Sequence, residues 1–203
     1  MSDWLTPETL PSADAVPGTL QLRLGDDQAL PEALFTLTSL SELVIDGTRL
    51  AAIPERIARL TNLTSITIFS AQALVCPREL FCLPHLTHLV IRNIGTLTLP
   101  EKVTNLAPLT ELRIVNAHLR DIPPWIAKLR MTLRTLDLSA NELREVVVHW
   151  LKFCELRSVD VSQNWLDAAA IEELLDHIWE QGAKCRKGPQ LVLEPQRKPP
   201  RSG

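Results

Sequence analysis

The sequence lacks a long apolar run and a strong excess of either charge. Its 203 residues carry 21 lysines and arginines against 24 aspartates and glutamates, a net charge of -3, so no broad basic surface for nucleic acid is expected. No stretch approaches the length of a membrane-spanning helix, and residues 1–7 have neither the basic start nor the apolar core of a signal peptide. We therefore expect a cytoplasmic protein with no membrane partner; secretion without a cleavable signal peptide is the alternative.

Sequence signatures of catalysis are missing as well. The chain contains no GxSxG, HExxH, Walker or GxGxxG motif. Its four cysteines form no CxxC pair, which favours reduced thiols packed in the core over a disulfide framework. These are Cys76, Cys82, Cys154 and Cys185. No enzyme activity, no cofactor and no metal are expected.

The chain does contain a repeat of 23 residues. Five prolines stand 23 residues apart: Pro31, Pro54, Pro77, Pro100 and Pro123. A series of leucines keeps the same spacing except for one step of 24: Leu40, Leu63, Leu86, Leu109, Leu133 and Leu156. A period of this size is typical of a solenoid, in which each unit packs on its neighbours.

Each repeat is predicted to contain a short strand and a helical return. The phrase LRTLDL, which starts at Leu133, alternates apolar and polar residues, as a strand does. The phrase IPERIARL, which starts at Ile53, has a spacing that suits a helical or 3₁₀ turn with proline at its start. Because one unit cannot bury its apolar face alone, the strands should stack into a curved parallel sheet with the helical turns on its convex side. The predicted fold class is α/β.

The pattern LxxLxLxxNxLxxIPxxIxxLxx resembles that of leucine-rich repeats, in the intracellular 23-residue form found in Ras-pathway scaffolds and bacterial leucine-rich proteins. The resemblance covers residues 17–166, about seven repeats, and implies a solenoid. The asparagine of the pattern, which in the family ties adjacent turns together, is present as Asn141 and Asn164. Earlier repeats carry other residues there: Thr48, Ala71, Ile94 and Ala117. Alanine and isoleucine side chains donate no hydrogen bond, so irregular turns are expected in the middle repeats, whereas Thr48 can partly substitute.

The segments at both ends are expected to cover the solenoid. Residues 1–16 predict an irregular N-terminal cap, with Trp4 over the first core layer. Residues 167–194 predict a C-terminal cap: a helix N-capped by Asp167, followed by an edge strand at 190–194. The apolar face of that helix comprises Ile171, Leu174, Leu175 and Ile178. Residues 195–203 are basic and proline-rich, and a flexible tail is expected there.

The strand positions left free by the leucine pattern form three columns on the predicted concave face. One column is Val44, Thr67, Val90, Arg113, Asp137 and Asp160; beside it lie Asp46, Phe69, Arg92, Val115, Ser139 and Ser162; the third is Glu42, Ser65, His88, Glu111, Thr135 and Ser158. They predict an apolar patch around Phe69, with Arg92 and Arg113 next to it and acidic residues farther along. The competing interpretation is that Arg113 and Asp137 only pair with each other and that Phe69 is an isolated surface aromatic.

Two histidine-based sites are the alternatives to a purely binding surface. His85 and His88 with Cys82 resemble zinc ligands, but they lack the tight paired spacing of closed zinc sites. His88 and Glu111 take equivalent positions on successive strands, as the acid and base of a hydrolase would, although an exposed, screened pair is the favoured interpretation.

The sequence thus predicts a non-enzymatic protein–protein interaction module, whether adaptor, inhibitor or effector. The alternative is the substrate-targeting part of a bacterial effector or signalling enzyme whose catalytic domain lies outside these residues. The partner is another protein, and neither its identity nor the oligomeric state is predicted. The predicted binding residues on the concave face are Glu42, Val44, Asp46, Thr67, Phe69, His88, Val90, Arg92, Glu111, Arg113, Asp137 and Asp160.

Overall fold

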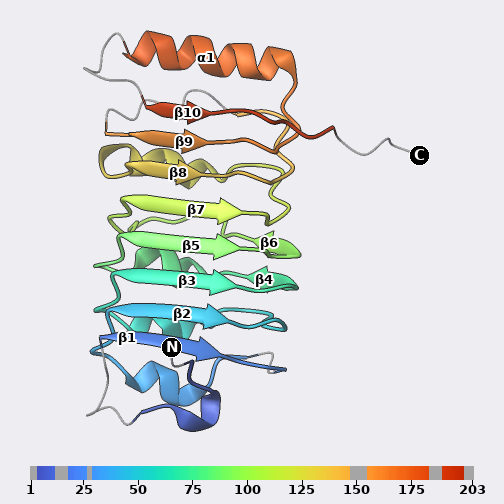
Figure 1. Cartoon of the computed structure of the whole chain (residues 1–203). Coiled ribbons are helices and arrows are strands. Elements are labelled where there is room, and N and C mark those ends of the chain that lie inside the picture. Colours follow the sequence, from blue (N-terminus) through green and yellow to red (C-terminus); the bar gives the residue numbers. More distant parts are fainter. Residues whose placement is uncertain (1–3, 12–17, 27–28, 147–154, 183–188, 199–203) are drawn as a thin grey trace.

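The computed structural model describes residues 4–11, 18–26, 29–146, 155–182 and 189–198. Within them, eight parallel strands form one sheet in the order β1-β2-β3-β5-β7-β8-β9-β10 (Figure 1). The strands are β1 (Thr19–Arg23), β2 (Glu42–Asp46), β3 (Ser65–Phe69), β5 (His88–Arg92), β7 (Glu111–Val115), β8 (Thr135–Asp137), β9 (Ser158–Asp160) and β10 (Gln190–Val192). The strands of successive repeats therefore lie side by side in the sheet, as a solenoid requires.

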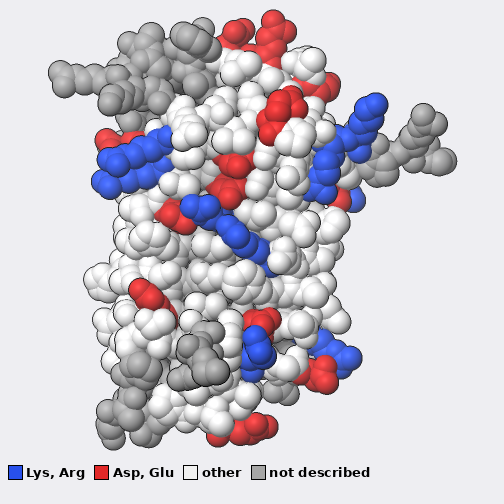
Figure 2. Space-filling view, viewed as in Figure 1, with Lys and Arg blue, Asp and Glu red and all other residues white. Residues whose placement is uncertain are grey.

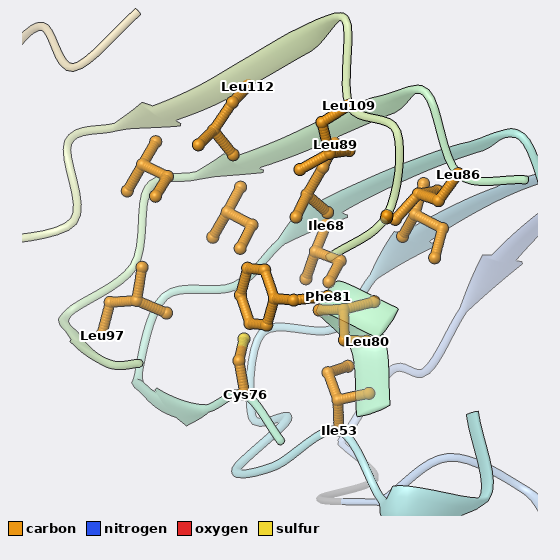
Figure 3. Packing of buried hydrophobic residues seen from close by; sticks show 14 of the residues in the cluster. Ile53, Ile68, Cys76, Leu80, Phe81, Leu86, Leu89, Leu97, Leu109 and Leu112 are labelled. Atoms are coloured by element: carbon orange, nitrogen blue, oxygen red, sulfur yellow. The ribbon is translucent and has the colours of Figure 1, made fainter. Parts of the chain in front are cut away.

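The strand leucines and isoleucines point into one continuous core behind the sheet. In β2, Leu43 and Ile45 are buried while the residues between and beside them are not, and the other strands follow the same alternation. Figure 3 shows this core between the strands and a helical turn, with Phe81, Cys76 and Leu89 among its side chains. The predicted inward orientation of the leucines is confirmed, because Leu43, Leu112 and Leu136 are all at most 4% exposed.

Short 3₁₀ helices return the chain behind the sheet. Four of them follow a proline of the repeat: η3 (Glu32–Thr36), η4 (Glu55–Arg59), η5 (Arg78–Cys82) and η6 (Pro124–Met131). In η4, Pro54 sets the extended entry and Ile57 faces the core. The predicted helical or 3₁₀ turn with proline at its start is thus confirmed in these four repeats.

The repeat of Pro100 departs from the prediction, because the structure assigns no helix to it. The residues after Glu101 and Lys102 are Val103, Thr104 and Asn105, which favour helix less than the residues at these positions in the other repeats. Trp125 of the next repeat occupies this region: its ring centroid lies 4.7 Å from that of Phe81, and its Nε1 donates a 2.9 Å hydrogen bond to the Pro100 carbonyl.

The two pattern asparagines tie neighbouring repeats together from inside the core. Asn141 is fully buried; its Oδ1 accepts hydrogen bonds from the backbone amides of Ala117 and Leu119 at 3.0 and 3.2 Å. Its Nδ2 donates to the Ile114 carbonyl of the preceding repeat at 2.6 Å. Asn164 repeats the arrangement one coil later, bonding the Leu143 amide and the Leu138 carbonyl.

The middle repeats, which lack the asparagine, have irregular turns as predicted: bends at residues 71–72, 93, 95 and 116–117 replace the hydrogen-bonded turns found at 48–49 and 139–140. A second small sheet also ties two of these repeats together. Strands β4 (Ala73–Val75) and β6 (Thr96–Thr98) pair in parallel beyond the ends of β3 and β5 (Figure 1). Their central residues, Leu74 and Leu97, fill the core. At the earlier turn Thr48 takes the substitute role, donating from Oγ1 to the Gly25 carbonyl at 3.1 Å.

The N-terminal segment covers the first repeat through its leucines. Leu5 forms a parallel bridge with Leu22 on the outer edge of β1, and Leu5 and Leu10 pack against the core. Trp4, expected over the first core layer, instead lies against a charged group: the Arg23 guanidinium stands 4.8 Å from its ring centroid. The edge of β1 and the first core layer are therefore both covered.

The C-terminal cap contains helix α1 (Ala168–Gly182) and edge strand β10. Asp167 Oδ1 accepts a 2.9 Å hydrogen bond from the Ala170 amide, as expected of an N-cap. Leu174 is fully buried and Ile171 packs against the core, whereas Leu175 is 36% exposed; the side chain of Ile178 lies outside the described residues.

The start of the predicted tail is bound to the last repeat. The backbone amide of Arg197 donates to the Asn164 carbonyl, and Gln196 Nε2 donates to the Val161 carbonyl at 3.1 Å while its Oε1 accepts from the Asn164 amide at 3.0 Å. The half-buried Gln196 therefore continues the row of side-chain amides begun by Asn141 and Asn164. The prediction of a flexible tail is therefore wrong for residues 195–197, which are bound to the last repeat.

Candidate functional site

The candidate site is the open face of the eight-stranded sheet, opposite the core, which we call the open sheet face. The three columns predicted from the sequence are in register on it. Val44 pairs with Thr67, Thr67 with Val90, and Val90 with Arg113, and the same column continues through Asp137 to Asp160. The other two columns pair in the same way along the strands, except that Ser139 and Ser162 follow the ends of β8 and β9.

An uncharged patch lies on the N-terminal half of this face. It comprises the half-buried side chains of Val44, Thr67, Phe69 and Val90, and we call it the Phe69 patch. Figure 2 shows the uncharged area over β3 and β5, between charged groups above and below it. Side chains on neighbouring strands of a sheet stand about 5 Å apart, so these four contact one another across β2, β3 and β5.

Most charged residues on the face are paired within the protein. Arg113 Nε lies 2.6 Å from Glu111 Oε1, and its other nitrogen lies 3.6 Å from Asp137 Oδ2. Arg23 Nε lies 3.2 Å from Asp46 Oδ2. The pairing of Arg113 with Asp137, the competing interpretation of this column, is therefore present.

The acidic end of the face has a structural role that the sequence columns did not reveal. Asp137 Oδ1 accepts hydrogen bonds from the amide and the hydroxyl of Ser139 at 3.0 and 2.6 Å, and Asp160 binds Ser162 in the same way at 2.9 and 2.7 Å. Both aspartates thus close a turn at the end of their strand. The sequence signal was the D-x-S phrase that recurs in both repeats.

Arg92 differs from the other cations of the face. Its register neighbours are Phe69 on β3 and Val115 on β7, both without charge. No carboxylate of the described residues lies within ion-pair distance, and its buried Nε has no hydrogen-bond partner there. It therefore has unused hydrogen-bonding capacity at the border of the Phe69 patch.

The histidine-based alternatives gain no support from the geometry. His88 Nδ1 shares a 2.8 Å hydrogen bond with the Thr87 hydroxyl, while Glu111 is bound by Arg113, so the two candidates for acid–base chemistry have other partners. Among the described residues no three His, Cys, Asp or Glu side chains converge as metal ligands would. Burial raises the pKa of the Cys76 thiol to about 12, so it has little thiolate character.

One hollow of about 880 Å³ lies away from the open sheet face, lined by residues 95–102, 118–124 and Glu142. It borders the repeat that lacks its helix. On its wall Glu142 lies 2.6 Å from His118 Nδ1 and 3.0 Å from Arg120 Nε. Burial of the Glu142 carboxyl raises its pKa, but the hydrogen bonds and charges of His118 and Arg120 together outweigh this effect and lower the pKa.

No helix in the described part of the chain has the length and apolar character needed to cross a membrane. The sequence matches no protein-family model and no curated protein. The structure is similar to that of a leucine-rich-repeat protein from Leptospira interrogans, with a TM-score of 0.57 and 24% sequence identity over 76% of this chain. The chain spans 46% of that protein, less than half of its length. Together with the parallel sheet and its 3₁₀ returns, this likeness shows that the chain has the fold of a leucine-rich-repeat solenoid.

Proposed function

We propose that the protein is a non-enzymatic recognition module that binds another protein on the open sheet face. The observation that carries this proposal is the Phe69 patch, an uncharged area on a rigid sheet with Arg92 at its border. Aromatic and arginine side chains at the centre of a contact area contribute most to the binding energy of protein interfaces. Eight strands about 4.8 Å apart span about 34 Å, which suits a standard interface of about 800 Å² per partner.

The distribution of charge also supports a protein partner. The net charge of -3 and the internal pairing of Arg23 and Arg113 leave no row of free cations along the described part of the face of the kind that binds nucleic acid. An open sheet also offers a small molecule less enclosure than a cleft does. We propose the cytoplasm as the site of action, because the free thiols of Cys76 and Cys82 suit a reducing compartment.

The experiment starts from partners that co-purify with the full chain and are identified by mass spectrometry. Binding of each purified partner is then measured for the wild type and for a Phe69→Ala, Arg92→Ala, Arg113→Ala variant. We expect binding by the variant to be weaker by about a hundredfold or more, since its substitutions remove the aromatic and two cations of the face. Circular dichroism checks that the variant is folded.

A matched control changes the opposite side of the molecule. Met131 is 74% exposed on η6, behind the sheet, so Met131→Ala removes an exposed apolar side chain from the helical side. We expect this variant to bind every partner as the wild type does. Equal affinities of the wild type and the triple variant would overturn the assignment of the site, and a partner that is a catalytic protein would favour the substrate-targeting alternative.

A further inference from the structure

We infer that the partner of the open sheet face presents a carboxylate to Arg92 and, beside it, an apolar side chain that packs on Phe69. The inference rests on the proposed function and adds the chemistry of the partner to it. The binding segment is therefore an acidic–apolar stretch of a protein rather than a basic one. This chemistry follows from the charged side chains of the face: most of them already have partners within the protein, and Arg92 does not.

Among the described residues, three arginines contribute to the open sheet face from β1, β5 and β7, and two of them have carboxylate partners. Arg23 is bound to Asp46, and Arg113 is bound to Glu111 and Asp137. Those three carboxylates are thus already bound to other arginines. Asp160, farther along, accepts from Ser162. Among the three arginines of the described face, Arg92 is therefore the one without a carboxylate partner.

The surroundings of Arg92 favour one class of binding group. Its side chain is half-buried, and its Nε is shielded from solvent with no acceptor of the described residues within hydrogen-bond distance. Because Nε is closed to solvent, a partner would reach the guanidinium through its terminal nitrogens, which make no hydrogen bond or ion pair to the described residues. The planar guanidinium pairs best with a carboxylate, which accepts two parallel hydrogen bonds.

The neighbours of Arg92 decide what accompanies the carboxylate. Phe69 and Val115 are its partners in register on either side, and Val90 precedes it on the same face of β5. An apolar side chain of the partner that covers Phe69 would also exclude water from the ion pair, which strengthens it. Nucleic acid is a poorer fit because its affinity depends on several phosphate contacts at once, and the face offers one free cation among the described residues.

The test uses a random peptide library displayed on phage, selected against the immobilised full-length chain. Peptides that bind the wild type but not Phe69→Ala are retained and sequenced. We expect Asp and Glu to be enriched several-fold in them next to an apolar residue, and we expect each retained peptide to bind Arg92→Glu at least about tenfold more weakly. Selection on Arg92→Glu itself should enrich Lys and Arg instead.

The control is Arg59→Glu, the same change at an exposed arginine on η4, which should leave the selected sequences unchanged. If retained peptides show no acidic preference, or bind Arg92→Glu as tightly as the wild type, the inference is wrong while the proposed function stands. If no peptide depends on Phe69, both fail. Melting curves of each variant, followed by circular dichroism, separate loss of binding from loss of fold.

Discussion

Asn141 is a buried polar residue with every polar atom of its side chain used. Its amide group accepts from Ala117 and Leu119 and donates to Ile114, and it is not exposed to solvent. Replacing it by alanine would leave backbone amides and carbonyls of two repeats without partners. We expect Asn141→Ala to lower the free energy of unfolding by about 2–4 kcal/mol, measured by urea denaturation.

Asn62 provides the matched control for this substitution. It is exposed and makes one hydrogen bond, from Nδ2 to the Thr38 carbonyl at 2.8 Å. Water can replace that bond, so Asn62→Ala should cost about 1 kcal/mol or less. Equal destabilisation by the two substitutions would contradict a structural role for the buried amide row.

Glu142 makes stability depend on pH in acid. Its pKa is lowered from the ordinary value of 4.5 because the effects of His118 and Arg120 outweigh that of burial. A carboxyl whose pKa is lower in the folded state contributes stability above its unfolded pKa and loses it as pH falls through the folded value. Both partners are more than half exposed, so solvent screening limits the contribution to about 1 kcal/mol.

We expect Glu142→Gln to melt at a lower temperature than the wild type between about pH 5 and pH 7, with the difference shrinking below about pH 4.5. Thermal melts followed by circular dichroism across this range measure it. Glu101→Gln is the control, because Glu101 lines the same hollow and has no ion pair among the described residues. A melting-temperature difference between the wild type and Glu142→Gln that does not change with pH would refute the assigned role of the carboxylate.

At the scale of the elements, local patterns predicted the strands well because each strand buries alternate residues against the same core. The period that places Leu43 and Leu112 inside also set the register of the outward columns, so the geometry of the open sheet face followed from the sequence. The predicted helical returns are present except at Pro100, where the structure has no helix. There the side chains that favour helix are missing, and Trp125 from the next repeat fills the space.

What the sequence could not supply was contact between residues far apart along the chain. The pairing of β4 with β6 and the role of Gln196 as an extra amide in the row of Asn141 and Asn164 each depend on how neighbouring coils stack. The same holds for the site. Position in a column showed that Arg92 and Arg113 face outward, but only the side-chain geometry separated the paired arginine from the unpaired one.

At the scale of the whole molecule, stability depends on covering the two ends of the stack, since each repeat contacts only its neighbours. Leu5 and Leu10 cover the first repeat, and α1 covers the last through Leu174. The row formed by Asn141, Asn164 and Gln196 extends to the same end. The C-terminal repeats therefore depend on both a cap and a polar row, whereas the Phe69 patch lies several repeats away from them.

This separation predicts that damage to the C-terminal cap frays the solenoid from one end. Leu174 is fully buried, so Leu174→Ala should remove about 2–4 kcal/mol of packing energy from α1. Hydrogen exchange should then accelerate first in β9 and β10 and least in β2 and β3, because neighbouring repeats stabilise one another in series. Leu175→Ala, at a 36% exposed position of the same helix, should change exchange little. Uniform acceleration across all strands would mean that the repeats unfold as one unit, and that the open sheet face near Phe69 depends on a cap at the far end of the sheet.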